Sequence, residues 1–279
     1  MVECEGLVYI YKSRQLEVVA LQGLDLHVER GEMVAIAGRS GSGKTTLMNI
    51  LAGVDVPTAG RAFVGGSDLT RMNESERDRY RHETVGYLLQ RSLANLVPDL
   101  SALENVQLAT LTGTRVHDGR ARLLLDRLGL GGRLADRPAS LDGGQKIRLA
   151  LAVALANGPR LLLADEPTAE LDTATAHSVL GDLSALLDEL DTTAIFVTHD
   201  AELERYARRV IQIRDGKTST ETRWTGSVAD ELVIMDRAGR IQLPRAYVEK
   251  LALKERVRLR LDGDRISILR PDAEDGHHD

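Results

Sequence analysis

Residues 33–46 read Met-Val-Ala-Ile-Ala-Gly-Arg-Ser-Gly-Ser-Gly-Lys-Thr-Thr, and they indicate the fold class more directly than any other segment of the sequence. The continuous apolar run Met33–Ala37 predicts a strand that is buried on both faces. The residues that follow Gly43 have a helical pattern, so strand, glycine loop and helix form one unit of an α/β fold. Gly38–Thr45 fits the pattern G-x-x-x-x-G-K-[ST] in this context, which predicts a phosphate-binding loop.

Each part of this loop has a chemical role in binding a polyphosphate. Its glycines allow backbone N–H groups to converge on the phosphates, and the start of the following helix adds a positive dipole end. The Lys44 ammonium supplies a full charge to the β- and γ-phosphates, and the Thr45 hydroxyl is a ligand for Mg²⁺. The residues expected to contact the nucleotide are Gly38, Arg39, Ser40, Gly41, Ser42, Gly43, Lys44, Thr45 and Thr46.

A second motif, Leu161-Leu-Leu-Ala-Asp165-Glu166, predicts a buried strand that ends in two acids. In a parallel sheet such a strand end lies at the same edge as the glycine loop. Asp165 is then expected to hold Mg²⁺, mainly through water, and Glu166 to orient or deprotonate the attacking water. Acids often close strands, so this motif indicates a site only together with the loop.

The periodicity outside these motifs predicts an α/β fold. Residues 2–36 are expected to form strands, 74–83 an exposed helix, and 92–137 helices interrupted by glycines. Further helices are predicted at Gly144–Ala156 and Thr173–Leu190, and buried strands at Leu161–Asp165 and Ala194–Thr198. The 3.6-residue and two-residue repeats of apolar positions are the basis of these assignments.

The composition narrows the class of protein. The chain has 279 residues and a mass of 30.5 kDa, with 43% hydrophobic and 28% charged residues, as is usual for a globular protein. One cysteine, Cys4, excludes an intramolecular disulfide and a cysteine metal cluster. No apolar run approaches the ~20 residues that span a bilayer, and no secretory signal is visible. The net charge of −6 is not typical of a general nucleic-acid binder.

Six motifs in a characteristic order resemble the nucleotide-binding subunit of ATP-binding cassette (ABC) transporters. The resemblance covers roughly residues 2–220. The motifs are the loop at 38–45, Gln90 after Val85-Gly-Tyr-Leu-Leu, the segment Leu141-Asp142-Gly143-Gly144-Gln145, Asp165-Glu166-Pro167-Thr168, Ala169-Glu-Leu-Asp172, and His199 after Ile-Phe-Val-Thr. The implied fold is a RecA-like core with an antiparallel β-subdomain and a helical subdomain at about 91–157.

The resemblance also implies a mechanism, with ATP and Mg²⁺ as ligands. Tyr11 lies where an aromatic ring stacks on adenine in this family, and an ordinary strand tyrosine is the alternative interpretation. Gln90 would sense Mg²⁺ and water, and His199 would bind the γ-phosphate and hold the attacking water. Two subunits would close head to tail, so that 141–145 of one caps the ATP held by the other. Asp172 would lie in the contact between the two sites.

The signature segment departs from the family pattern at one position. The family usually has serine where this chain has Asp142, and that serine faces the γ-phosphate. A carboxylate there is repulsive by ~1 kcal/mol at ~4 Å in water, and by several-fold more where water is excluded. In one interpretation Asp142 only caps the following helix and turns aside. In the other, it slows ATP-driven closure or marks a degenerate site.

Residues 31–47 and 51–60, and the long stretch between Tyr11 and Leu21, are most similar to the macrolide-exporter, lipoprotein-releasing and cell-division ATPases. That resemblance implies a cytoplasmic subunit, peripheral on the inner face of the cell membrane. It would drive a separate permease by mechanical coupling, as a homodimer or a heterodimer. The alternative is a soluble regulatory ATPase that acts on a partner through its C-terminal module.

The C-terminal part differs in composition from the rest. We expect a linker at 221–227, a small β-rich domain at 228–270 and a disordered tail at 271–279. The pattern of 235–261 is similar to the AbrB/SpoVT swapped-hairpin fold, whose hairpins interleave as dimers. Such a dimer would tether two ATPase halves or dock a regulator. DNA binding through Arg237, Arg240 and Arg245 is the alternative, but the overall acidity argues against a nucleic-acid partner.

Overall fold

The computed structural model describes residues 1–12, 16–89, 95–110, 118–198, 204–225, 228–236, 238–254 and 256–271. The chain divides into two compact units, Met1–Leu232 and Val233–Asp279. Within the described residues, no helix has both the length and the hydropathy that crossing a membrane would require.

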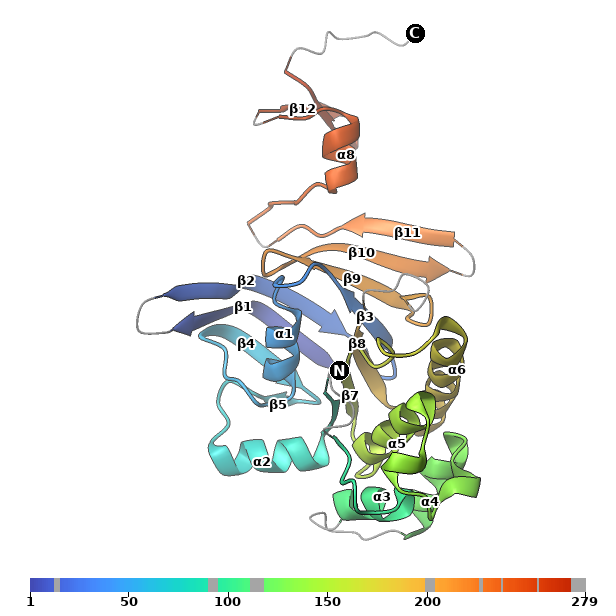
Figure 1. Ribbon diagram of the computed structural model, residues 1–279. Coiled ribbons are helices and arrows are strands. Elements are labelled where there is room, and N and C mark those ends of the chain that lie inside the picture. The colour runs from blue at the N-terminus through green and yellow to red at the C-terminus, as the bar shows by residue number, and fades with distance from the viewer. Residues whose placement is uncertain are drawn as a thin grey trace. The chain divides into compact units, whose positions relative to one another are not determined.

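The first unit is built around a seven-stranded sheet of order β11-β10-β9-β3-β8-β7-β6 (Figure 1). The strands from β9 to β6 pair in parallel, and β10 runs antiparallel to β9. Their bounds are β3 (Met33–Ala37), β6 (Val85–Leu88), β7 (Leu161–Asp165), β8 (Thr193–Val197), β9 (Arg209–Arg214), β10 (Lys217–Thr225) and β11 (Val228–Val233). The predicted runs at 33–37 and 161–165 are therefore central strands.

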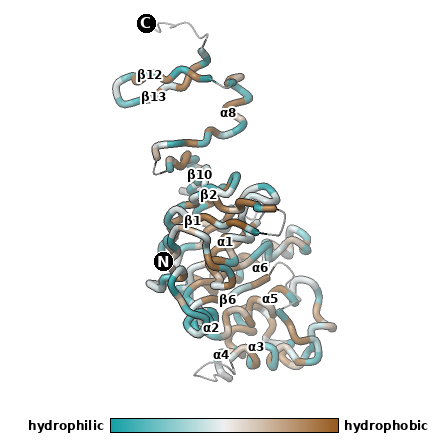
Figure 2. Tube along the Cα trace, turned by 90° about the vertical axis from the view of Figure 1, so that its left-hand side faces the viewer, coloured by the Kyte–Doolittle hydropathy of each residue, from teal (hydrophilic) through white to brown (hydrophobic). Residues whose placement is uncertain are grey.

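A four-stranded sheet of order β2-β1-β4-β5 accompanies it. Its strands are β1 (Val2–Lys12), β2 (Glu17–Val28), β4 (Ala59–Val64) and β5 (Ser67–Asp68), and the pairs β1–β2, β1–β4 and β4–β5 are antiparallel. One hydrophobic core joins this sheet to helix α1 (Lys44–Leu51) and to one face of the larger sheet. Helix α2 (Glu74–Glu83) has the predicted bounds and is a hydrophilic stretch in Figure 2.

Four helices and the opposite face of the large sheet form a second core. The helices are α3 (Ala102–Thr110), α4 (Asp118–Arg127), α5 (Gly143–Leu155) and α6 (Thr173–Leu190). Alternate strand residues serve the two cores: Val34 and Ile36 face α1, whereas Ala35 and Ala37 belong to the core that contains α5 and α6. This alternation explains why the strand is apolar at every position. Figure 1 shows α1 and α5 on opposite sides of the strands.

Three differences from the sequence-based expectations concern boundaries. The expected linker at 221–227 is strand over its described part 221–225, because β10 pairs residue by residue with β9. Strand β11 belongs to the large sheet, although 228–232 were expected in the C-terminal domain. Gly119 lies inside α4 and does not interrupt it. Of the expected tail, residues 272–279 lie outside the described residues.

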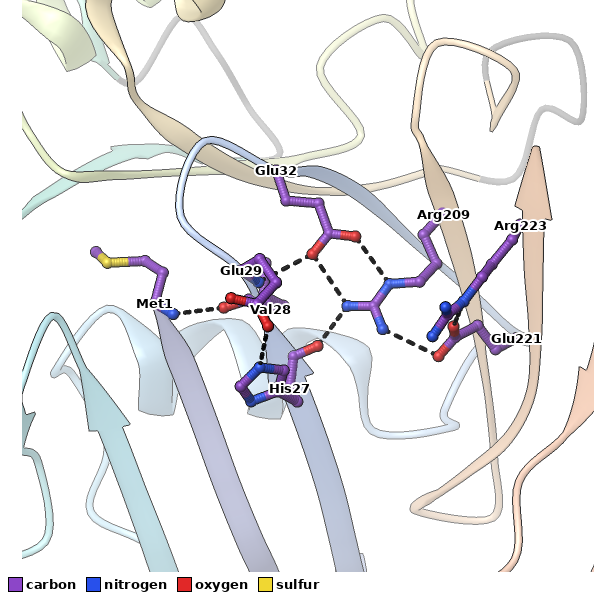
Figure 3. A network of polar contacts seen from close by, with 8 residues as sticks. All are labelled: Met1, His27, Val28, Glu29, Glu32, Arg209, Glu221 and Arg223. Carbon is purple, nitrogen blue, oxygen red and sulfur yellow. Dashed lines mark hydrogen bonds and ion pairs between the residues drawn. The ribbon is translucent and has the colours of Figure 1, made fainter. Parts of the chain in front are cut away.

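A buried arginine holds β10 to the sheet at the end away from the nucleotide loop (Figure 3). Arg209 at the start of β9 pairs with Glu32 at 2.9 Å and with Glu221 of β10 at 3.1 Å. Its guanidinium also donates a hydrogen bond to the carbonyl of His27, at the end of β2. All three charged side chains are largely buried, so their mutual pairing offsets the cost of removing them from water.

The second unit is small and leaves many apolar side chains exposed. It contains helix α8 (Arg245–Lys250), which follows Pro244, and the antiparallel hairpin β12 (Arg258–Asp262) and β13 (Arg265–Leu269). Cross-strand pairs Leu259–Ile268 and Leu261–Ile266 place four aliphatic residues on one face of the hairpin. Leu259 is 65% exposed and Leu261 is 73% exposed.

Candidate nucleotide-binding site

The glycine loop forms the turn between strand β3 and helix α1, as the motif predicts. Gly38 has φ +145°, and a Cβ there would lie 2.3 Å from the carbonyl oxygen of Ile213, so no side chain fits. The hydroxyl of Ser42 is buried and has no hydrogen-bond partner in the described structure. A buried polar atom without a partner calls for a ligand, and the position of Ser42 inside the loop fits a phosphate.

The Lys44 side chain folds back over the loop. Its ammonium donates hydrogen bonds to the carbonyls of Gly38 at 2.7 Å and Arg39 at 2.9 Å, which uses two of its three N–H donors. Burial lowers the pKa of Lys44, and the negative charges of Glu166 and Asp165 partly oppose that shift. The loop backbone thus surrounds the buried Lys44 ammonium, and a positive charge in this position favours binding of an anion.

A hydroxyl and a carboxylate meet beside the loop. The Thr45 hydroxyl donates to Oδ2 of Asp165 at 3.4 Å, although 120 residues separate them. This confirms the expectation that strand β7 ends next to the loop. The described residues contain no group of three or more His, Cys, Asp or Glu suited to a metal. Two oxygen ligands beside a phosphate site fit Mg²⁺, which usually binds through one or two protein oxygens, water and substrate phosphate.

Glu166 has a strained backbone. Its φ is +49°, a conformation rare for residues other than glycine, and its N–H donates to the carbonyl of Val197 at 3.0 Å. Strain of this kind costs about 1–3 kcal/mol and collects at functional sites. The reversed backbone ends strand β7 directly after Asp165.

Tyr11 reaches the loop helix from strand β1. The residue is 45% exposed, and its hydroxyl lies 3.1 Å from the hydroxyl of Thr46. The ring of Tyr9 packs against it edge to face, with centroids 4.8 Å apart. An exposed aromatic surface beside the loop is available for stacking on a base.

The signature segment 141–145 begins helix α5. Asp142 is the N-cap: its Oδ1 accepts the Gln145 N–H at 2.8 Å, and the Gln145 side chain accepts the Asp142 N–H at 3.1 Å. The capping geometry that the first interpretation of Asp142 requires is therefore present. Leu141 is buried, Gly143 is exposed, and a Cβ on Gly144 would lie 2.6 Å from Thr175 of α6.

Asp172 is the N-cap of α6 and lies near that segment in the fold. Its two carboxylate oxygens accept the N–H of Thr175 at 3.0 Å and the hydroxyl of Thr175 at 2.7 Å. These hydrogen bonds lower the pKa of Asp172. Thr175 thus contacts both Asp172 and the region of Gly144.

The structure brings some predicted site residues together and separates others. The loop, Thr45, Asp165 and Tyr11 gather around the start of α1, whereas 141–145 belong to the helical core on the other face of the sheet. Gln90 and His199 lie outside the described residues, so their roles remain predictions.

A glycine loop between a strand and a helix, a buried lysine and a threonine–aspartate pair define a P-loop nucleoside triphosphatase. Residues 21–169, more than half of the chain, match the protein family described as "ABC transporter". The chain therefore belongs to this family: it is an ABC ATPase, a class that binds ATP with Mg²⁺ and hydrolyses it.

The relatives include proteins that the match covers almost completely and proteins that are about three times as long as the matched part. Lipoprotein-releasing system ATP-binding protein LolD 2 of Caulobacter vibrioides is 43% identical, over 76% of this chain and 93% of that protein. Macrolide export ATP-binding/permease protein MacB of Rhodopirellula baltica is 40% identical, over 82% of this chain and 34% of that protein. The chain thus spans about a third of the length of the macrolide-export proteins.

A solved structure agrees with the fold. The dimeric post-hydrolysis state of the ATP-binding cassette MJ0796, bound to ADP and Pi, matches with a TM-score of 0.73 at 35% identity. The match covers 81% of this chain and 100% of that chain.

Proposed function

We propose that the chain is the energy-coupling ATPase of a membrane transporter, driving a separate permease through ATP-dependent closure of a head-to-tail dimer. The single observation that supports this most directly is the separation of the site into two halves. Helix α1, which follows the phosphate loop, and helix α5, which begins at the signature segment, pack on opposite faces of one sheet, and we infer that one chain does not cap its own nucleotide. A second copy in the reverse orientation would complete both sites, and the MJ0796 cassette is dimeric.

The proposed roles follow the geometry. Lys44 and the loop N–H groups would bind the phosphates, Thr45 and Asp165 would hold Mg²⁺, and Tyr11 would stack on adenine. Mg²⁺ would neutralise phosphate charge when bound. Glu166 would accept a proton from the attacking water or orient it. The predicted roles of Gln90 and His199 belong to the same proposal.

The partner and the location are inferred from relatives. The names of the LolD and MacB relatives describe ATP-binding components of lipoprotein-releasing and macrolide-export systems. We infer a permease partner of that mechanically coupled group, with this chain peripheral on the inner face of the membrane. Co-purification of an integral membrane protein with the tagged chain from detergent extract tests this. A chain that is recovered without one would favour the regulatory alternative.

The catalytic proposal is tested by Mg²⁺-dependent ATP turnover of the purified chain. Glu166→Gln should abolish turnover and retain ATP binding, because the amide cannot take a proton. Glu83→Gln, at an exposed glutamate that ends helix α2 and lies outside all six motifs, is the matched control and should leave turnover unchanged. Equal turnover of wild type and Glu166→Gln would contradict the role of Glu166. Absence of ATP binding by the wild type would contradict the site itself.

For the second unit we propose an AbrB-like pairing of two copies that tethers the ATPase halves. An isolated two-stranded hairpin is at best marginally stable, and this one exposes the apolar pairs Leu259–Ile268 and Leu261–Ile266. Two of its exposed arginines already have carboxylate partners, Arg240 with Asp236 and Arg245 with Glu249. That pairing argues against a role in DNA binding. Arg237 lies outside the described residues.

The tether is tested with the full-length chain in the absence of nucleotide. We expect a dimer by sedimentation velocity, and a monomer after Leu259→Asp. Arg260→Asp, on the polar face of the same strand, should remain dimeric. A wild-type monomer without nucleotide would refute the tether and leave the catalytic proposal intact.

A further inference from the structure

The turn that joins β9 to β10 lies against the backbone of the phosphate loop. The N–H of Gly216 donates to the carbonyl of Ser42 at 3.1 Å, and the Gly216 carbonyl accepts the N–H of Gln22 at 2.9 Å. A single residue of this turn therefore connects the loop to strand β2 of the four-stranded sheet. None of the motifs that identify the family includes this turn.

Close packing at Gly216 excludes any side chain. Its φ is +72°, and a Cβ there would lie 2.6 Å from the carbonyl oxygen of Ala20 and 3.0 Å from Cα of Leu21. Gly43, the last residue of the loop, approaches the same carbonyl, since its Cβ would also lie 2.6 Å from it. Loop, turn and strand β2 thus meet backbone to backbone at one point.

The peptide bond explains what this contact can do. The Ser42 carbonyl and the Gly43 N–H belong to one planar trans peptide unit and point in opposite directions. A hydrogen bond that fixes the Ser42 carbonyl therefore also fixes the direction of the Gly43 N–H. That N–H has no hydrogen-bond acceptor among the described residues, and it precedes the first turn of α1, where phosphates bind.

We propose that Gly216 is a positioning residue for ATP: through Ser42 it orients the Gly43 N–H toward the phosphates. This inference rests on the proposed role of the loop in phosphate binding. The turn is itself held in place by its flanking strands, because Lys217 pairs with Arg214 and the Arg209–Glu221 ion pair connects the middle of β10 to β9 (Figure 3). Glycine is needed because any Cβ would collide with Ala20 and Leu21 of strand β2 and so displace the turn, together with the Gly216 N–H that the Ser42 carbonyl accepts.

The test measures MgADP affinity of the full-length chain by isothermal titration calorimetry, since ADP is not consumed. Gly216→Ala should raise the Kd about tenfold, as expected when an orienting hydrogen bond is lost. The KM for ATP should rise by a similar factor, with kcat changed less than about threefold because the carboxylates are untouched. Gly66→Ala is the matched control: its φ is +88° and no atom lies within 4 Å of the added Cβ.

Equal MgADP affinity of the Gly216→Ala and Gly66→Ala variants would overturn the proposal. If Gly216→Ala does not fold, amide hydrogen exchange of the wild type decides. MgADP should slow exchange at Gly216, which contacts the loop through its N–H, as well as within the loop. Protection of 38–45 without any change at 213–218 would overturn the inference. Failure of the wild type to bind MgADP would instead contradict the proposed function.

Discussion

Asp142 has two effects that a single substitution separates. Its carboxylate accepts the Gln145 N–H at 2.8 Å and so caps helix α5, and the side chain is exposed in the single chain. In the proposed closed dimer, the same carboxylate would approach the phosphates held by the partner. Substitution by serine or asparagine removes the charge of Asp142 but retains a side-chain oxygen that can cap the helix. Substitution by alanine removes both the charge and the capping oxygen.

The effect on stability follows from the cap. Asp, Asn and Ser are nearly equivalent N-caps, and the charge adds about 0.3–1 kcal/mol at a helix N-terminus. Asp142→Ser and Asp142→Asn should therefore lower the free energy of unfolding by about 0.5 kcal/mol. Asp142→Ala should lower it by about 1–2 kcal/mol, because the Gln145 N–H also loses its acceptor. Urea unfolding followed by circular dichroism measures the difference.

Removal of the Asp142 charge should slightly destabilise the single chain but favour closure of the ATP-bound dimer. Two like charges at ~4 Å repel by about 1 kcal/mol in water. Two equivalent sites in a dimer double this to about 2 kcal/mol, a factor of about thirty in a dissociation constant. We therefore expect the MgATP-bound dimer to be about thirtyfold tighter in both Asp142→Ser and Asp142→Asn than in the parent chain, and ATP turnover to rise.

The assay is sedimentation velocity with MgATP, compared with MgADP for each variant. All chains carry Glu166→Gln, so that ATP persists, and Leu259→Asp, so that the proposed tether does not hold them together without ATP. Turnover is measured separately with Glu166 intact. If the dissociation constant and turnover of Asp142→Ser both stay within twofold of the parent, Asp142 does not slow closure. An Asp142→Ala variant as stable as the parent would show that the cap contributes nothing.

Three further predictions concern other parts of the chain. Arg209→Met should lower the free energy of unfolding by about 3 kcal/mol, because buried Glu32 loses its ionic partner and buried Glu221 keeps only the exposed Arg223. Exposed Arg71→Met should cost under about 1 kcal/mol, and similar urea midpoints for the two variants would contradict this. Tyr11→Ala should weaken ATP binding by about tenfold and Tyr11→Phe by less than about threefold, and equal losses in calorimetry would argue against stacking. Since burial lowers the pKa of Lys44, ATP affinity should fall as alkaline pH passes that pKa. The nucleotide-free chain should become more stable across the same interval, because its unfolded state holds this proton more tightly; Lys44→Met should remove both trends.

The parallel core and the phosphate loop could be predicted because their residues have no competing interpretation. Strand Met33–Ala37 serves two cores and is apolar throughout, and the glycines of the loop occupy conformations that few other residues adopt. The proximity of Thr45 to Asp165 followed from the topology, since the carboxyl ends of parallel strands share one edge. The motif order alone did not place 141–145 on the opposite face from the loop, because that depends on how α5 packs.

Strand β10 could not be predicted, for a physical reason. Its buried positions are polar: Ser219, Thr220 and Glu221 are all under 9% exposed. Glu221 is buried because Arg209, twelve residues earlier and across the hairpin, supplies a partner. An ion pair between two strands leaves no regular pattern of apolar residues in the sequence. A polar strand that is buried through such a pair therefore resembles a linker when only the sequence is known. The turn at Asp215–Gly216 that begins this hairpin does have a local signal, because Asp-Gly is typical of turns.

The proposed tether and the charge at Asp142 bear on the same equilibrium. A flexible connection that holds two ATPase halves together gives an effective concentration of about 1 mM. This concentration is about a thousand times that of untethered chains at about 1 μM, so the tether favours association of the two halves by about 4 kcal/mol. This exceeds the repulsion of about 2 kcal/mol assigned to the two Asp142 carboxylates. The repulsion would then oppose persistent closure of the dimer after hydrolysis without preventing closure while ATP is bound.

Asp142→Ser should therefore increase the turnover of the Leu259→Asp chain, in which the tether is lost, by a larger factor than it increases the turnover of the tethered chain. Equal effects in both backgrounds would show that the two features are independent.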